Sequence, residues 1–210
     1  MIDLIDPGLD AYIKRLLPAR DPVLAEMEAY AAEHDVPIVG PAVGTLLQIL
    51  TRSIGADRVF ELGSAIGYST AFFAQAVGRG GQVFYTDGDP ANAEQARGYL
   101  QRMDLLERVS IKVGDAVRAL EATTGYFDAI FIDVDKEGYP AALRAAAPRV
   151  RRGGYLLADN VLWSGKVIDG NVDDPATDGI RQFNETLFSL EDFRSVIVPL
   201  RDGVAIARRE

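Results

Sequence analysis

Short apolar runs alternate with helix-forming stretches along most of the chain from residue 56 onward. Strands are predicted at 58–62, 82–86, 108–113, 127–133 and 154–159, and helices at 68–77, 90–103, 115–122 and about 136–150. Parallel strands need a helix-sized connection, so this alternation predicts a parallel sheet. The runs 127–133 and 154–159 are almost wholly apolar, which is typical of strands covered on both faces.

Helical patterns precede this region. Asp21-Pro22 is typical of a helix start, with Asp as the N-cap and Pro at the first helical position, and helix-forming residues continue to Asp35. A further helix is predicted after Pro41 from four apolar residues at helical spacing: Val43, Leu46, Leu47 and Leu50. We therefore expect a helical addition in front of the sheet.

The C-terminal part adds one helix and two strands. A polar loop follows Asn160, and a helix is predicted at 177–188. Only Arg201-Asp202 separates the strands predicted at 193–200 and 203–209, so these strands are expected to be antiparallel neighbours. The whole pattern predicts a single doubly wound α/β domain over residues 1–210, with N-terminal helices in 1–55 and the core in 56–210.

The composition narrows the chemistry. The chain has no Cys and only one His, which excludes disulfides, thiol nucleophiles and zinc sites built on Cys or His clusters. A metal would need oxygen ligands, which favours Mg²⁺, Ca²⁺ or Mn²⁺. The net charge of −9 argues against binding nucleic acid or anionic membranes through bulk electrostatics. No signal-peptide pattern or membrane-length apolar run is present, so we expect a soluble, cytoplasmic protein.

A glycine-flanked turn follows the first predicted strand, in the segment ELGSAIGYS from Glu61 to Ser69. Gly63 and Gly67 would let a ligand approach backbone amides at a helix N-terminus, and Asp87 ends the next strand, where a carboxylate can bind ribose hydroxyls. Dinucleotide-binding turns carry a middle glycine that makes room for a pyrophosphate. That glycine is missing here, which favours an adenosine ligand without a pyrophosphate over NAD.

Polar residues also follow the fourth and fifth predicted strands. Asp133 and Lys136 follow one strand, and Asp159 and Asn160 follow the other. Sequential parallel strands often lie side by side, so their ends can share one edge of the sheet. Three oxygen donors would then lie close enough to hold a divalent cation: Asp133, Asp159 and Asn160. Asp and Asn at strand ends also commonly cap the next helix or turn, which is the competing interpretation. A cation at a helix N-terminus is disfavoured, which makes Lys136 a candidate general base.

Taken together, these motifs resemble a known family. The segments ELGSAIGYS, FIDVDKEGYP, LADNVLWSGKV, IRQFNETL and RDGVAIA are similar, in this order, to the cation-dependent O-methyltransferases of the caffeoyl-CoA and catechol type. The resemblance covers residues from about Ile38 to Ala207. It implies a Rossmann-like class I methyltransferase fold, with a seven-stranded, mostly parallel sheet, an antiparallel last strand and helices on both faces.

The resemblance also implies a set of site residues. Asp133, Asp159 and Asn160 would bind the metal, Mg²⁺ being favoured, and Lys136 would take the proton from the acceptor hydroxyl. The residues implied at S-adenosylmethionine (SAM) are Val39 with Gly40 over the cofactor, Glu61, Gly63, Tyr68 and Ser69 at its methionine end, Asp87 at the ribose, Asp115 and Ala116 at the adenine, and Asp133. Trp163 would form an aromatic wall near the acceptor.

The implied reaction is SAM-dependent methylation of a catechol-like phenol with vicinal hydroxyls, and the family implies a homodimer. A CoA thioester is less expected, because the nearest basic residues, Lys14, Arg15 and Arg20, form no clear phosphate site. A tRNA hydroxyuridine methyltransferase is a second possibility, and it would bind RNA through local arginines: Arg149, Arg151 and Arg152. The same fold could also serve an NAD-dependent oxidoreductase or a non-catalytic binding protein.

Overall fold

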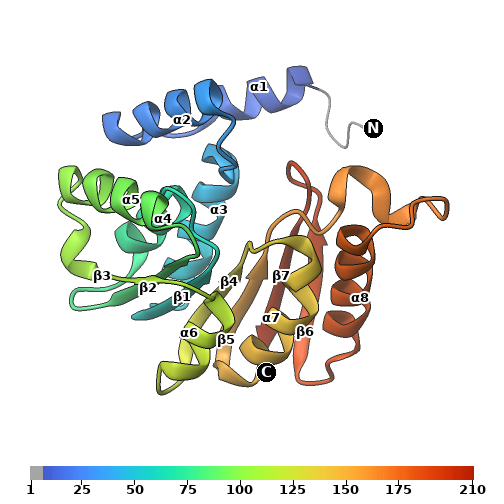
Figure 1. The fold of residues 1–210 in the computed structure, drawn as a ribbon. Helices are drawn as coiled ribbons and strands as arrows, with labels where there is room; N and C mark the ends of the chain where they lie inside the picture. The colour runs from blue at the N-terminus through green and yellow to red at the C-terminus, as the bar shows by residue number, and fades with distance from the viewer. Residues whose placement is uncertain (1–6) are drawn as a thin grey trace.

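A computed structural model describes residues 7–210 of the chain, and the first six residues of the predicted helical addition lie outside this range. Its centre is a seven-stranded sheet with the order β3-β2-β1-β4-β5-β7-β6 (Figure 1). The strands are β1 (Arg58–Leu62), β2 (Gln82–Asp87), β3 (Val109–Val113), β4 (Phe127–Ile132), β5 (Val150–Ala158), β6 (Phe193–Val198) and β7 (Val204–Arg209). Strands β1 to β5 pair in parallel, and β7 is antiparallel to both of its neighbours. The predicted sheet and its reversed last strand are confirmed.

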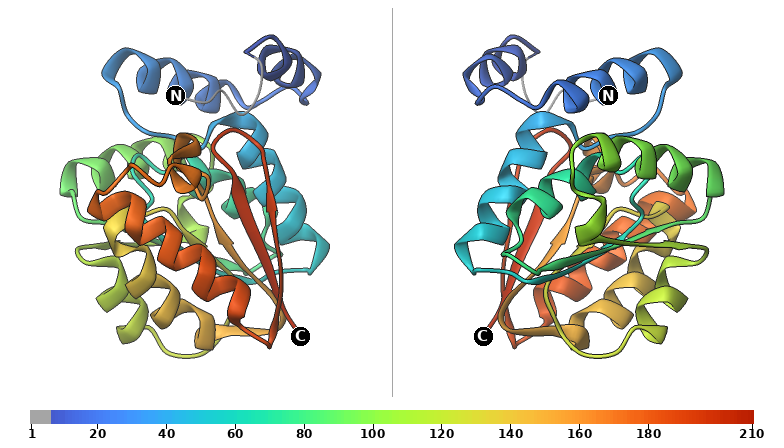
Figure 2. Two further views of the ribbon diagram at one scale, coloured as in Figure 1. Left: turned by 90° about the vertical axis from the view of Figure 1, so that its right-hand side faces the viewer. Right: turned by 90° about the vertical axis from the view of Figure 1, so that its left-hand side faces the viewer.

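Helices cover both faces of this sheet. The α-helices are α1 (Pro7–Leu16), α2 (Pro22–His34), α3 (Gly40–Ser53), α4 (Tyr68–Ala76), α5 (Pro90–Arg102), α6 (Ala116–Ala122), α7 (Tyr139–Ala146) and α8 (Pro175–Ser189). Helices α3, α4 and α5 lie on one face and α6, α7 and α8 on the other, while α1 and α2 cross one edge of the sheet (Figures 1 and 2). Within residues 7–210, no helix is long and apolar enough to cross a membrane.

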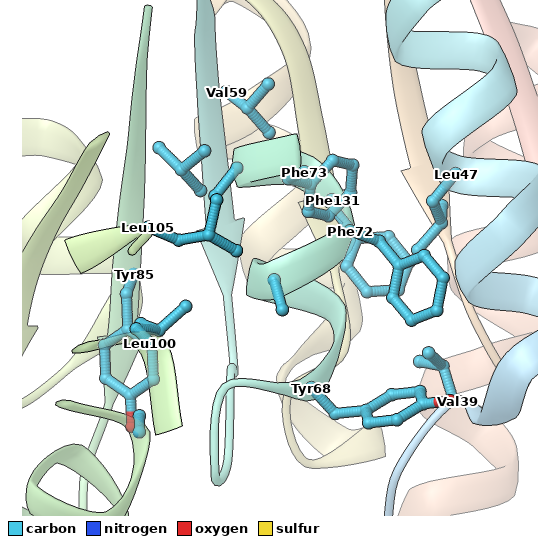
Figure 3. Packing of buried hydrophobic residues seen from close by; sticks show 14 of the residues in the cluster. Val39, Leu47, Val59, Tyr68, Phe72, Phe73, Tyr85, Leu100, Leu105 and Phe131 are labelled. Carbon is cyan, nitrogen blue, oxygen red and sulfur yellow. The ribbon is translucent and has the colours of Figure 1, made fainter. Parts of the chain in front are cut away.

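The two faces of the sheet carry separate apolar layers, because successive strand residues point to opposite faces. In β1, Val59 faces the layer of α2 to α5, and Phe60 faces the layer of α6 to α8. Figure 3 shows Leu47 of α3 beside Phe72 of α4 on the first of these faces. This packing fixes α4, and with it the turn that leads into α4 from β1.

Two predicted elements differ from the observed ones. Strand β5 begins at Val150 rather than 154, and it carries an irregular register against β4 around Gly153 and Gly154. The helix predicted at 136–150 is divided into a short 3-10 turn, η2 (Lys136–Gly138), α7, and a second 3-10 turn, η3 (Ala147–Arg149). A proline lies near the start of α7 and another lies in η3, and proline resists continuation of a helix through its interior.

Candidate functional site

A cavity of about 1410 Å³ lies at the carboxyl ends of the strands. Its wall comes from the segments that follow β1, β2, β3, β4 and β5, and residues of α1 and α2 cover it. Ligands of open α/β sheets bind at this edge. Of the site residues that the resemblance implies, all but Glu61 line the cavity: Val39, Gly40, Gly63, Tyr68, Ser69, Asp87, Asp115, Ala116, Asp133, Lys136, Asp159, Asn160 and Trp163.

The turn between β1 and α4 requires glycine. Gly63 has φ +83°, and a Cβ added there would lie 2.3 Å from the Asp133 carbonyl oxygen. Gly67, with φ +84°, is the N-cap of α4, and a Cβ there would lie 2.9 Å from that of Ala96. Both positions adopt left-handed backbone that favours glycine. The turn therefore packs tightly between the end of β4 and α5, and its residues line the cavity.

Asp87 is held in a fixed orientation at the end of β2. Its Oδ2 accepts a hydrogen bond from Ala65 N at 2.9 Å, and its Oδ1 accepts from Asp89 N at 2.8 Å and from Asn92 Nδ2 at 3.1 Å. Asp115 follows β3 and is the N-cap of α6, where its side chain accepts a hydrogen bond from Arg118 N. These two carboxylates mark one side of the cavity.

Glu61 is the one implied site residue that does not line the cavity. Its side chain is fully buried and accepts hydrogen bonds from Ser64 Oγ at 2.8 Å and from Thr70 Oγ1. Burial raises the pKa of Glu61 to about 7, although these hydroxyls and that of Ser69 lower it. Its Oε1 has no hydrogen-bond partner. Glu61 supports the turn from below because its hydroxyl partners belong to the turn and to the first residues of α4.

Tyr68 joins the cavity wall to its cover. The side chain is buried beside Val39 (Figure 3), and its hydroxyl donates to Glu28 Oε1 of α2 at 2.7 Å. Arg20 pairs with the same carboxylate, with Nε 2.7 Å from Oε1. Burial, together with the neighbouring Glu28 carboxylate, raises the pKa of Tyr68 well above its ordinary value, so this residue stays a hydrogen-bond donor.

Asp133, Asp159 and Asn160 meet where β4 and β5 end side by side. Asp159 is 1% exposed, and its Oδ1 is buried without a hydrogen-bond partner. Burial and the nearby charge of Asp133 raise the pKa of Asp159, while the charges of Arg201 and Lys136 lower it. A buried carboxylate oxygen without a donor fits a cation ligand, since buried polar groups are otherwise paired.

The donor set is small. Within residues 7–210, no group of three His, Cys, Asp or Glu side chains is placed to hold a metal ion. The set here has two carboxylates and the amide of Asn160, which adopts left-handed backbone with φ +57°. Hard oxygen donors of this kind fit Mg²⁺, which usually keeps several water ligands.

Lys136 lies directly beside this donor set. Its Nζ donates to Asp133 Oδ1 at 2.8 Å and to the hydroxyl of Tyr139 at 2.9 Å. The Tyr139 hydroxyl in turn donates to the backbone carbonyl of Asp159 at 2.8 Å. Tyr139 is fully buried. The amine of Lys136 is therefore held between the ends of β4 and β5 by a side chain of α7.

Trp163 is a further neighbour of Lys136. It lies at the start of a 3-10 segment, η4 (Trp163–Ile168), inside the predicted polar loop. The Nζ atoms of Lys136 and Lys166 lie 5.9 Å and 5.3 Å from the centres of its rings. Its Nε1 is buried without a partner. Trp163 and Ser164 both have positive φ, at +47° and +53°, so the loop holds the indole in a conformation that is uncommon for such residues.

With this geometry in place, a family model described as O-methyltransferase matches residues 18–210. The chain belongs to the O-methyltransferase family. Catechol O-methyltransferase of Niastella koreensis is 34% identical to it over 218 residues, covering 99% of each chain. Catechol O-methyltransferase of Mycobacterium tuberculosis is 35% identical over 165 residues, covering 77% of this chain and 75% of that protein.

Solved structures of other O-methyltransferases have the same fold. The Bacillus cereus O-methyltransferase, in complex with SAH, is 31% identical, with a TM-score of 0.88 and coverage of 97% of both chains. The Streptomyces achromogenes O-methyltransferase TomG, involved in tomaymycin synthesis and in complex with SAM, is 29% identical, with a TM-score of 0.87 and coverage of 96% of both. The architecture, with its cavity at the carboxyl edge, is thus that of the O-methyltransferases.

Other residues of this O-methyltransferase site carry little signal in the sequence. Glu28, Tyr139 and Arg201 all line or support the cavity. Tyr139 and Arg201 lie in the segments FIDVDKEGYP and RDGVAIA, but neither was predicted as a site residue. Only the pairing of α2, α7 and the β6–β7 hairpin with this edge reveals them. Tyr139 follows Lys136 by one helical turn, and that spacing is the one sequence signal that could have found it.

Two of the three arginines considered for RNA binding are used inside the protein. The guanidinium of Arg149 donates to the backbone carbonyls of Leu120, Thr123 and Gly125, and Arg151 pairs with Asp128. These contacts lie around the amino ends of β4 and β5, opposite the cavity. They hold loops together at the end of the sheet away from the cavity, and neither arginine lines the cavity.

Proposed function

We propose that this O-methyltransferase transfers the methyl group of SAM to one hydroxyl of a phenol with vicinal hydroxyls, with a divalent cation, Mg²⁺ being favoured, at Asp133, Asp159 and Asn160. The observation that carries this proposal is the buried, unpartnered Oδ1 of Asp159 beside a second carboxylate and a lysine amine. No other part of the described cavity combines an incomplete oxygen-donor set with a group that can move a proton.

The other side of the cavity supports SAM as the methyl donor. The backbone turn at Gly63 lines the cavity at the position proposed for the methionine end, and Asp87 is oriented to accept from ribose hydroxyls. Asp115 with Ala116 follows the neighbouring strand, at the position proposed for the adenine. The turn has no middle glycine for a pyrophosphate, which disfavours NAD. The solved relatives in complex with SAH and with SAM agree with this proposal.

A cation held there would supply Lewis-acid chemistry that makes a phenolic hydroxyl more acidic. Asp133 and Asp159 would supply its negative charges and Asn160 an uncharged oxygen. Asp159 is preorganised for this role, because its carboxylate is already out of bulk water.

Lys136 is proposed to take the proton from the acceptor hydroxyl as the uncharged amine, after the ammonium form that pairs with Asp133 has released one proton to solvent. Its Nζ is fixed by Tyr139 and Asp133, so the amine faces the same point as the donor set. The acceptor oxygen then forms a bond to the methyl carbon while the carbon–sulfur bond breaks, giving the methyl ether and S-adenosylhomocysteine (SAH), with the proton on Nζ. Since little other bond chemistry is needed, positioning of the two reactants supplies most of the rate.

The test is methyl transfer from SAM to 3,4-dihydroxybenzoate and to a matched monohydroxy phenol, with Mg²⁺ and after chelation. We expect turnover of the vicinal diol only, loss of that turnover on chelation and its return with added Mg²⁺. Methylation that survives thorough chelation would remove the cation from the proposal. Methylation of tRNA, with no turnover of any phenol, would replace the acceptor class.

A further inference from the structure

Four basic side chains line the cavity: Lys14, Arg20, Lys136 and Arg201. Three of them are in ion pairs, namely Lys14 with Asp10, Arg20 with Glu28 and Lys136 with Asp133. Within residues 7–210, Arg201 alone among the four has no carboxylate within ion-pair distance. A cation that lines a ligand cavity without a carboxylate partner is available to an anionic group on the ligand.

Arg201 is held at the tip of the β6–β7 hairpin. Its backbone is left-handed, with φ +52°, which is uncommon for a residue other than glycine and recurs at ligand-binding positions. The next residue, Asp202, accepts hydrogen bonds from Leu162 N at 2.9 Å and, through Oδ1, from Ser164 N. The hairpin tip is thus fastened to the loop that carries Asn160 and Trp163.

The guanidinium is directed by one further contact. Nη1 donates to the Ile38 carbonyl at 2.8 Å, and a Cβ added to Gly40 would lie 3.3 Å from the same nitrogen. The side chain is otherwise exposed, so Nε and Nη2 keep donors free of any hydrogen bond to the described residues. Planar guanidinium groups bind carboxylates through two such donors at once.

We propose that Arg201 binds a carboxylate on the acceptor, and that the preferred substrates are catechols with an acidic side chain. This rests on the proposed function, because an acceptor ring bound through its two hydroxyls at the donor set directs its remaining substituent away from it. Arg201 is on the hairpin next to that set and is solvent-exposed, and its charge also acts on Asp159. The specificity residue of this site is therefore supplied by β6 and β7.

The experiment compares each acid with its own methyl ester: 3,4-dihydroxybenzoate and caffeate against the two esters. The catechol is the same within each pair, so the ratio of kcat/KM for acid to ester isolates the carboxylate. We expect the wild-type protein to prefer the acid about 10-fold or more, in line with one charge-assisted contact. In Arg201→Gln the ratio is expected to fall to about 1, and in Arg201→Lys to an intermediate value.

Arg152→Gln is the matched control, since it removes the same charge from an exposed arginine near the amino end of β5. Its acid-to-ester ratio is expected to equal that of the wild-type protein. A wild-type preference for the esters, or an unchanged ratio in Arg201→Gln, would overturn this inference while esters are still turned over. No turnover of any of the four catechols would instead remove the proposed function on which it rests.

Discussion

The amine of Lys136 is held in place by several contacts. It is bonded to Asp133 and Tyr139, lies over the Trp163 ring and is only 12% exposed. A surface lysine would adopt many rotamers, whereas this one presents its nitrogen at a fixed point. Such fixed placement is what a proton acceptor in methyl transfer requires.

Lys136→Met is therefore expected to lower kcat by about 100- to 10,000-fold, the usual contribution of a positioned base. The affinity for SAH, measured by calorimetry, should change little because the turn at Gly63 and the Asp87 carboxylate are untouched. Lys166→Met is the matched control, since Lys166 also contacts the Trp163 ring but is exposed. Equal kcat values in both variants would exclude Lys136 as the base.

Glu61 links stability to pH. Burial raises its pKa from 4.5 to about 7, so the folded protein retains a proton that the unfolded chain has lost over this range. The free energy of unfolding that this group contributes is greatest below about pH 4.5 and falls as the pH rises through 7. Glu61→Gln carries a side chain that does not ionise, so this contribution to the pH dependence of stability is absent from the variant.

Between pH 5 and pH 8, we expect the wild-type protein to lose about 2 to 3 kcal/mol more stability than Glu61→Gln. Urea denaturation at the two pH values measures this difference. Thr70→Val, which removes one hydrogen bond to Glu61, should leave a pH dependence at least as steep. Parallel pH profiles for wild type and Glu61→Gln would show that Glu61 is ionised equally in both states.

At this scale the sequence allowed prediction of residues that directly follow a strand. Asp87, Asp133, Asp159 and Asn160 all lie at the cavity because parallel strands end at one edge. It did not show that the Glu61 side chain turns away from the lining, since strand position gives no rotamer. Nor could it show Arg201, whose arrival depends on how the hairpin packs against the loop of Trp163.

Among the elements, α8 has a part in the site that its sequence does not announce. It packs against η2, and a Cβ added to Gly179 would lie 2.4 Å from the backbone carbonyl of Lys136 and 3.1 Å from Glu137 Cα. Both are backbone atoms, which cannot swing aside as a flexible side chain can. Helix α8 thus sets the position of the segment that carries the proposed base.

Gly179→Ala is expected to destabilise the protein by about 1 to 3 kcal/mol, the usual range for an overpacked core, and to lower kcat by displacing Lys136. Gly98→Ala is the control within an exposed part of α5, where an added Cβ meets nothing within 4 Å. That variant should gain about 0.5 to 1 kcal/mol from helix propensity. Thermal melts and initial rates measure both effects, and a fully active, equally stable Gly179→Ala would contradict the packing argument.

The elements that periodicity predicted best are those with uninterrupted patterns. Strand β1 was predicted at 58–62, as observed, because its apolar run is bounded by clear turn residues. Strand β5 was predicted too short, since Arg151, Arg152 and Gly153 interrupt the apolar pattern, and the regular pairing with β4 breaks between Val150 and Tyr155. A local pattern of apolar residues cannot reveal a strand whose first residues are held in place by long-range contacts, such as the ion pair of Arg151 with Asp128.

In the molecule as a whole, helix α2 lines the cavity and also contacts α4 and α5. Helix α2 contacts the body through Glu28 with Tyr68, through Tyr30, whose hydroxyl accepts from Gln95 at 2.8 Å, and through Glu26 with Arg102 at 2.5 Å. The last pair is exposed and contributes little by itself. A ligand in the cavity would touch α2 and the sheet edge together.

SAH is therefore expected to protect α2 from hydrogen exchange and to stabilise the whole protein. At about 100 times its Kd, a ligand that binds only the folded state adds about 2.7 kcal/mol, which corresponds to a rise in Tm of roughly 5 to 10 °C for a chain of this size. Exchange in β6, away from the proposed cofactor side, reports the global stabilisation, so protection of α2 beyond that of β6 is the local effect. An unchanged exchange rate in α2 at saturating SAH would show that this helix does not respond to the cofactor.

The position of β7 between β5 and β6 has a consequence for how the molecule is made. Strand β6 is synthesised first, but its only strand partner within residues 7–210 is β7, which follows it. Neither β6 nor the hairpin tip can join the sheet until residues 204–209 have left the ribosome. A nascent chain ending at residue 203 would already contain every proposed cation ligand and Lys136, yet it would lack the strand that brings Arg201 to them. The cavity wall at Arg201 is thus completed only after β7 has paired with β5 and β6.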